Sequence, residues 1–280
     1  MDSEILSCAD DGQQADPATA GELHDIISGS LVVNRTKRTG CGVAIVICAV
    51  MASLVFGIFS AALFPAISNA IQRANMLAVS ASAKHIYITI VGANMEREPL
   101  GLGDVWPKTG KQTEEGNDLA QMTFKNSTDY FNALYDAEQR KIRRLEERGY
   151  SVTYFGFDLS KCAGPGVPQV PAGGRLTAEN NAWIIAANFD DDMPDIMPVL
   201  ISRNVDPASL IPQDGDLSQQ FLRPSKKYKT PFGNKGFILV RKGGATIMGS
   251  WRNVSLDVIY FGASEEELQA IREKIEYLAP

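Results

Sequence analysis

An uncharged apolar run over residues 43–64 dominates the hydrophobic pattern of the chain. The run is long enough to cross a hydrocarbon core, which takes about 20 helical residues. Arg35, Lys37 and Arg38 precede it, and the next basic residue is Arg73. By the positive-inside rule, this asymmetry predicts a single-pass anchor with a cytoplasmic N-terminus and an exported C-terminal part. A cleaved secretory signal is the alternative, but its apolar region is shorter and begins nearer the N-terminus.

The apolar pattern continues past Pro65, a residue that tends to kink helices, as a helical stalk over residues 65–94. Two apolar stripes recur along it at helical spacing. In water both must be covered, one by the chain's own domain and the other by neighbouring subunits, so we expect assembly through this helix. The stripe expected to assemble, called the stalk stripe below, comprises Ile67, Ile71, Ala74, Ala78, Ala81 and Ile88. The second stripe comprises Met76, Val79, Ala83, Ile86 and Ile90.

Residues 95–280 predict one extracytoplasmic globular domain. A helix is expected from a cap at Ser127 or Thr128 to about Arg148, and a capping box at Ser264 and Glu267 opens a second helix. Its Leu268, Ile271, Ile275 and Leu278 are expected to face a sheet. Strands are expected at 182–189, 197–202 and 254–261, in a hairpin of 236–241 with 245–248, and more weakly at 150–159. The fold class is therefore α+β, a long N-terminal helix packed on an antiparallel sheet.

Charge and composition exclude several classes of function. The net charge is −6, and no basic face indicates a nucleic-acid partner. Residues 1–42 form an acidic leader that we expect to be mostly flexible. Of the four cysteines only Cys162 lies in the exported part, so that domain has no internal disulfide. Of the two histidines only His85 lies there, and no nucleophile motif is present. We therefore predict that the chain is not an enzyme and needs no cofactor.

The densest carboxylate cluster in the chain lies between two expected strands. Carboxylate oxygens in loops are the ligands that Ca²⁺ prefers. The cluster lacks the spacing of an EF-hand loop, and Pro194 stiffens it. A solvated turn is therefore the favoured interpretation and a calcium site the alternative. The four residues are Asp190, Asp191, Asp192 and Asp195.

Two further groups of residues have a structural and a functional interpretation. Charges of both signs crowd the helix after Ser127, which favours a solvated face with i,i+4 ion pairs and leaves a docking surface as the alternative. The three tryptophans favour core packing over ligand binding. The charged residues are Glu138, Lys141, Arg143, Arg144, Glu146, Glu147 and Arg148; the tryptophans are Trp106, Trp183 and Trp251.

Basic residues, a glycine and an apolar run that continues as a long helix resemble the type IV pilin and type II secretion pseudopilin family. The matching positions are Lys37-Arg38-Thr39-Gly40 and the run from Val43, with Pro65 near the usual kink. The resemblance implies an inner-membrane protein with a periplasmic domain. It also implies cleavage by a prepilin peptidase after Gly40 or Gly42, and assembly with identical or different pilin-like subunits.

Five further segments, spread over the exported part, resemble pilin-like secretion proteins. Together with the N-terminal match they extend the resemblance over most of residues 36–262. The segments are 94–102, 105–108, 127–131, 192–195 and 231–236.

One position departs from the family pattern. Family members usually carry glutamate at the fifth mature position, where it pairs with the amino terminus of a neighbouring subunit. The two cuts place Ile45 or Ile47 there. A single-pass anchored periplasmic binding domain that does not assemble is therefore the alternative function.

Overall fold

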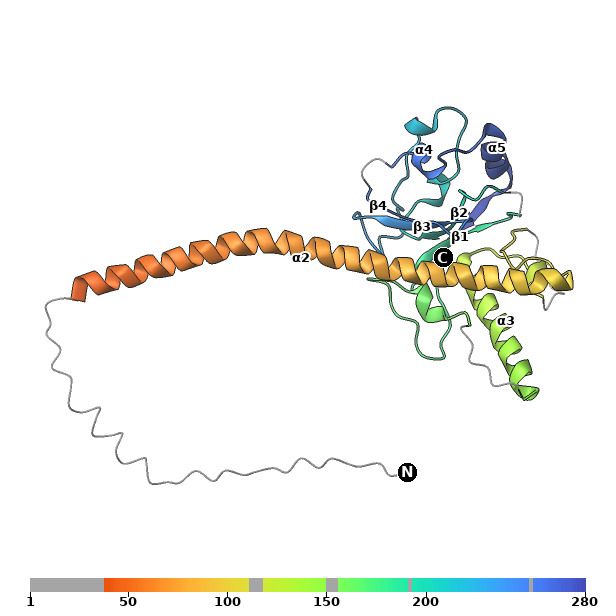
Figure 1. Ribbon diagram of the computed structural model, residues 1–280, viewed down its shortest axis with the longest axis horizontal. Helices are drawn as coiled ribbons and strands as arrows, with labels where there is room; N and C mark the ends of the chain where they lie inside the picture. The colour runs from red at the N-terminus through yellow and green to blue at the C-terminus, as the bar shows by residue number, and fades with distance from the viewer. Residues whose placement is uncertain (1–37, 111–117, 150–155, 191–192, 252–253) are drawn as a thin grey trace, which may run out of the picture. The chain divides into compact units, whose positions relative to one another are not determined.

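The computed structural model describes residues 38–110, 118–149, 156–190, 193–251 and 254–280. The chain divides into two compact units, one ending at Ala66 and the other running from Ile67 to Pro280. The second unit contains the stalk and all of the sheet, and Figure 1 shows its layers. The boundary falls one residue after Pro65, where a helix lacks one backbone donor. The predicted leader lies outside the described residues up to residue 37.

The long helix, α2, runs without interruption from Arg38 to Arg97 and includes Pro65. It ends because the short 3-10 helix Glu98–Leu100 follows, with proline in its first turn. Gly101 then adopts a left-handed φ of 65°, which glycine tolerates at a helix C-cap. The predicted long helix is thus confirmed, and it ends slightly later than residue 94.

Five antiparallel strands form one sheet in the order β4-β3-β2-β1-β5. In the register of β1, Ile185 is paired with Leu200 of β2 on one side and with Leu278 of β5 on the other. The predicted hairpin is confirmed as the β3–β4 pair. The strands are β1 (Trp183–Ala187), β2 (Pro198–Ser202), β3 (Phe237–Arg241), β4 (Thr246–Gly249) and β5 (Glu276–Leu278).

Helices cover both faces of this sheet. The stalk part of α2 and helix α3 (Ser127–Glu147) lie on one face, and α4 (Leu256–Ile259) and α5 (Glu265–Lys274) lie on the other (Figure 1). Every residue of β1 and β2 is therefore buried, and both strands read as continuous apolar runs instead of alternating patterns. The α+β class and the long helix packed on an antiparallel sheet are confirmed.

The N-terminal cap of α3 is Asn126, not Ser127 or Thr128. The Asn126 side-chain oxygen accepts a hydrogen bond from the Asp129 backbone N–H at 2.8 Å. Ser127 instead turns inward and donates its hydroxyl hydrogen bond to the Trp183 carbonyl at 2.7 Å. Ser127 therefore ties α3 to β1, which leaves capping to the residue before it.

The predicted strand at 254–261 is wrong, because this segment forms the short helix α4. Leu256, Ile259 and Tyr260 are buried, at a spacing that places them on one helical face. The predicted strand at 150–159 lies outside the described residues up to residue 155. Its last residue, Leu159, instead begins the 3-10 helix Leu159–Cys162.

The capping box of α5 is confirmed. Ser264 Oγ accepts from the Glu267 N–H at 3.2 Å, and the Glu267 carboxylate accepts from the Ser264 N–H at 2.7 Å. Leu268 and Ile271 are buried as predicted. The helix ends at Lys274, however, and the chain continues as β5, so Leu278 is buried from a strand and not from the helix.

Candidate functional site: the two faces of the stalk helix

One helix in the described part of the chain is long and apolar enough to cross a membrane, by length and composition alone, and it belongs to α2. The segment that meets this criterion is Leu63–Leu100, whereas the sequence predicts residues 43–64 as the span. A core helix of a soluble protein passes the same test. Much of this segment does pack on the domain, through Val79, Ala83 and Ile86 among others.

The two apolar stripes of the stalk have opposite environments. Four members of the second stripe, Val79, Ala83, Ile86 and Ile90, are buried in the core, and Met76 is half-buried. All six members of the stalk stripe are exposed, and Ile88 exposes 64% of its surface. The neighbouring Leu77, which the sequence analysis did not include, is also exposed. The stalk therefore presents a continuous apolar surface to solvent in the single chain.

Hydrogen bonds from side chains hold the buried face of α2 on the domain. Gln72 Nε2 donates to the carbonyl of Lys235 at 3.1 Å, and the Tyr87 hydroxyl donates to the carbonyl of Lys242. Asn94 Oδ1 accepts from the backbone N–H of Val105 at 2.7 Å. These contacts fix the rotation of the helix about its axis, and so determine which stripe faces outward.

An ion pair fixes the last turn of α2. The Arg97 guanidinium donates to both carboxylate oxygens of Asp118, at 2.7 and 2.8 Å, and to the carbonyl of Gly103 at 2.7 Å. Hydrogen bonds from Arg97 lower the pKa of Asp118 below its ordinary value. Both side chains are partly exposed, so we treat this pair as a modest contribution to stability.

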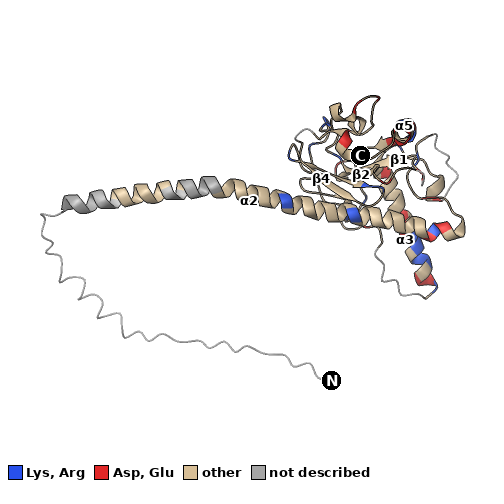
Figure 2. Cartoon of the chain, turned by 45° about the horizontal axis from the view of Figure 1, so that its top comes forward, with Lys and Arg blue, Asp and Glu red and all other residues tan. Residues whose placement is uncertain are grey.

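Two exposed cations, Arg73 and Lys84, lie along one edge of the stalk stripe by their helical spacing. Figure 2 shows basic residues in blue along α2. Within the described ranges neither Arg73 nor Lys84 has an acidic partner. A surface that combines apolar side chains with charges at its edge resembles the core-and-rim anatomy of protein interfaces.

The carboxylate cluster does not form a ligand set in the part of the chain that the structure describes. No group of three or more His, Cys, Asp or Glu side chains is arranged there to hold a metal ion. Asp190 pairs with Lys274 at 3.2 Å, and the backbone oxygen of Asp195 accepts from the Gly243 N–H at 2.8 Å. Asp191 and Asp192 lie outside the described residues, so the calcium site stays a prediction.

The tryptophans belong to the core, as predicted. Trp183 is fully buried and donates to the Lys161 carbonyl at 3.1 Å. The Trp106 ring lies tilted against the Phe189 ring with centroids 4.5 Å apart, and the half-buried Trp251 lies against Phe237.

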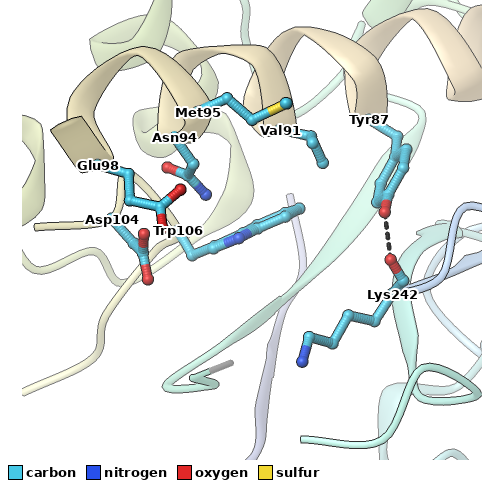
Figure 3. Close-up of a pocket in the computed structure, with 8 residues that line it drawn as sticks. All are labelled: Tyr87, Val91, Asn94, Met95, Glu98, Asp104, Trp106 and Lys242. Carbon is cyan, nitrogen blue, oxygen red and sulfur yellow. Dashed lines mark hydrogen bonds between the residues drawn. The ribbon is translucent and has the colours of Figure 1, made fainter. Parts of the chain in front are cut away.

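Trp106 also borders a pocket with a volume of about 240 Å³ (Figure 3). Tyr87 closes one end of the pocket through the hydrogen bond from its hydroxyl to the Lys242 carbonyl. The carboxylates of Glu98 and Asp104 lie near each other at the other end.

Nucleophilic chemistry finds little support among the described side chains. The Cys162 thiol is fully buried, and burial raises its pKa well above the ordinary value, so the reactive thiolate is disfavoured. His85 is half-buried instead of exposed, and its Nδ1 is buried without a hydrogen-bond partner.

The charged helix α3 differs from the predicted solvated face. Glu138 is only 5% exposed and its Oε2 has no hydrogen-bond partner. A signal was present in the sequence, because Glu138 falls on the same helical face as Phe131, Leu134, Ile142 and Leu145. Lys141 pairs with Glu96 of α2.

Glu138 borders a groove between the C-terminal end of α2 and α3, with a volume of about 520 Å³. Exposed leucines and arginines share this surface with it. We call it the α2–α3 groove; its principal lining residues are Leu100, Leu102, Leu134, Glu138, Arg140 and Arg144.

Gly40 and Gly42, the two predicted processing positions, both lie within α2, which begins at Arg38. Two of the resemblance segments, 127–131 and 231–236, make hydrogen bonds that join separate elements of the fold. Ser127 bonds Trp183, for example, and the carbonyls of Gly233 and Gly236 accept hydrogen bonds from Asn204 Nδ2.

No protein-family model, curated protein sequence or solved structure matches the chain.

Proposed function

We propose that the chain is a pilin-like structural subunit of a type II secretion or type IV pilus-type apparatus. It is anchored in the inner membrane by residues 43–64, with a cytoplasmic N-terminus and a periplasmic domain. Copies of it, or of related subunits, associate laterally through the stalk stripe. Its role is structural and not catalytic, and its partners are proteins and the membrane.

The exposed stalk stripe carries this proposal. Ile67, Ile71 and Ile88 expose apolar surface along about six turns of a helix whose opposite face is already buried. Burying such surface against another helix contributes about 25 cal/mol per Å². Ala74, Ala78 and Ala81, between the isoleucines, allow a second helix to approach closely. An extended apolar face of this kind is typical of a protein interface.

The anchor rests on sequence. The run 43–64 contains no charge, basic residues precede it, and α2 is continuous through it. Ile45 and Ile47, at the two candidate fifth mature positions, offer no carboxylate to a neighbouring amino terminus. Assembly therefore depends on apolar packing along the stalk instead of on that ion pair.

Photo-crosslinking tests the assembly. A photoreactive phenylalanine analogue replaces Ala78 in the full-length chain within native membranes, and a matched variant carries it at Asn69. Asn69 is exposed on the same stretch of α2 but lies off the stripe. We expect crosslinks to a pilin-like subunit from position 78 and at least several-fold fewer from position 69. Equal yields, or no subunit crosslink at either position, would reject assembly through the stripe.

Mass spectrometry of the mature N-terminus tests processing separately. A start at Cys41 or Val43 indicates a prepilin peptidase, whereas an intact Met1 indicates a plain signal anchor.

One observation favours the alternative, an anchored periplasmic binding domain that does not assemble. The Trp106 pocket combines an aromatic floor with the carboxylates of Glu98 and Asp104 (Figure 3). It is small, and Trp183 and Trp251 do not line it. An intact Met1 together with a monomeric chain in membranes would place this function first.

A further inference from the structure

Two surface features of the globular domain carry exposed apolar side chains and have complementary charges. One is the α2–α3 groove, and the other is the tip that follows α4, around Phe261. They belong to the same compact unit, and the helices that carry them, α4 for the tip and α2 with α3 for the groove, lie on opposite sides of the sheet (Figure 1).

The groove offers apolar surface, cations at its rim and one buried anion. Leu100 is 71% exposed and Leu102 is also exposed, although both border a concave surface. Arg140 and Arg144, one helical turn apart on α3, have no acidic partner among the described residues. The Oε2 of Glu138 is buried and lacks a hydrogen-bond donor. Because this oxygen is buried, the side chains that the groove presents to a partner are the exposed leucines and arginines.

The tip offers the reverse combination. Phe261 is 81% exposed, more than any other large apolar side chain described. Gly262 follows with a φ of 87°, a conformation that turns the chain sharply and leaves the phenylalanine on a projecting loop. Glu265 and Glu266 come next, both exposed, and Glu266 has no cationic partner in the described part of the chain.

We propose that the Phe261 tip of one copy docks into the α2–α3 groove of the next copy. The phenyl ring packs on Leu100 and Leu102, and the glutamates face Arg140 and Arg144 at the rim. Aromatic anchors in pockets, surrounded by charged rims, are the usual arrangement of interface hot spots.

Within one chain the sheet separates α4 from α2 and α3, so a contact between the tip and the groove joins two copies (Figure 1). Two different patches of the same chain then form the contact, which makes it heterologous. Heterologous contacts that do not close into a ring build open, helical arrays. The inference rests on the proposed assembly and gives it a second contact, between globular domains, in addition to the stalk contact.

The full-length chain in native membranes tests the contact through the same photoreactive analogue, placed at Leu102. We expect a crosslinked dimer in which position 102 is joined to the peptide that contains Phe261. A crosslink within one chain, to another protein, or to a different peptide of a second copy would overturn the proposal.

Matched variants identify the anchor. In the Leu102-labelled chain, Phe261→Ala is expected to lower the dimer yield about tenfold or more, as expected for a hot spot. Val258→Ala, an equally simple truncation of an exposed residue on α4, should leave the yield unchanged. Equal losses in both variants would mean that α4 acts only as a structural support.

A charge exchange tests the rim. Glu266→Lys and Arg140→Glu should each lower the yield about two- to fivefold, and the double variant should restore it. Failure of this rescue would reject the pairing of Glu266 with Arg140. Crosslinks from Ala78 separate the two proposals. If they persist while Leu102 gives no dimer, the domain contact fails and the stalk assembly stands. If both disappear, the proposed function fails as well.

Discussion

The two faces of the stalk helix have similar side chains, but one face is buried and the other is exposed. Ile86 and Ile90 are buried under the domain, whereas Ile67, Ile71 and Ile88 of the same helix face solvent. An amphipathic helix normally turns charged residues outward, so that apolar content alone reveals the covered face. Here apolar content does not distinguish the faces. The tertiary contacts decide which one is covered, and the other remains available for a partner.

The two faces also differ in what constrains their apolar side chains. On the buried face, size and shape are fixed by the packing of the domain. On the stalk stripe, side chains affect folding little in the single chain, so any constraint on them must come from association. Stability and assembly should therefore respond independently to substitutions a few residues apart.

The largest expected effect comes from truncating the buried face. Ile86 is 0% exposed, so Ile86→Ala leaves a cavity and should lower the free energy of unfolding by about 3 kcal/mol. Ile88→Ala, two residues away, should lower it by less than about 0.5 kcal/mol. Urea unfolding of the detergent-solubilised chain, followed by fluorescence of the buried Trp183, measures both. Similar losses in the two variants would show that the stalk stripe is covered in the monomer.

Replacing an alanine by leucine on each face should show the same difference between the faces, with smaller changes in the free energy of unfolding. Ala83→Leu overpacks a fully buried site and should lower the free energy of unfolding by about 1–3 kcal/mol. Ala78→Leu lies on the exposed face, and we expect an unchanged unfolding midpoint together with fewer subunit crosslinks. An Ala78→Leu variant that unfolds earlier would contradict the assignment of the faces.

The sequence correctly predicts the elements whose structure is determined by residues close together in the chain. The apolar periodicity gave α2, the capping box of Ser264 and Glu267 gave the start of α5, and the glycines after Lys242 gave the β3–β4 hairpin. In each case neighbouring residues determine the structure.

Elements that depend on distant residues were missed. β5 has only three residues and exists because it pairs with β1, so no local pattern predicts it. The segment 254–261 has few residues and many apolar ones, and alternation and helical spacing cannot be distinguished over such a length. In the structure this segment contains the helix α4, and Phe261, which follows the helix, is exposed.

The candidate site could be predicted only in part. The stalk stripe was identified residue by residue, but the choice between the two stripes depends on bonds such as that from Tyr87 to Lys242, far apart in sequence. Glu138 was assigned to a solvated face because charges surround it, although its spacing from Leu134 places it on the apolar side of α3.

A third prediction concerns the ion pair that holds the end of the stalk. Asp118→Asn should lower the free energy of unfolding by about 1 kcal/mol at pH 7, a value reduced because both side chains are partly exposed. The folded chain lowers the pKa of Asp118. The contribution is therefore present above the unfolded pKa of about 3.9 and is lost as the pH falls through the folded value.

Urea unfolding at several pH values checks this. The difference between wild type and Asp118→Asn should narrow below about pH 4 and vanish at lower pH. Asp136→Asn, which removes the more exposed pair with Arg175, is the control and should have a smaller effect. If the difference in the free energy of unfolding does not depend on pH, the loss comes from a change in the loop that carries Asp118 and not from the removal of its charge.

The smallest effect is expected where the domain first holds the stalk. Gln72 Nε2 donates to the Lys235 carbonyl at 3.1 Å in an exposed setting, so water can replace the bond. Gln72→Ala should change the free energy of unfolding by less than about 0.5 kcal/mol. It should nevertheless speed hydrogen exchange of the amides near residue 72, because local opening depends on few contacts there.

Asn75→Ala, on the next turn, removes an exposed side chain that makes no hydrogen bond within the described ranges and serves as the control. Faster exchange in Gln72→Ala alone would place the start of the held part of α2 at this residue, whereas unchanged exchange would show that the half-buried Met76 holds the helix by packing.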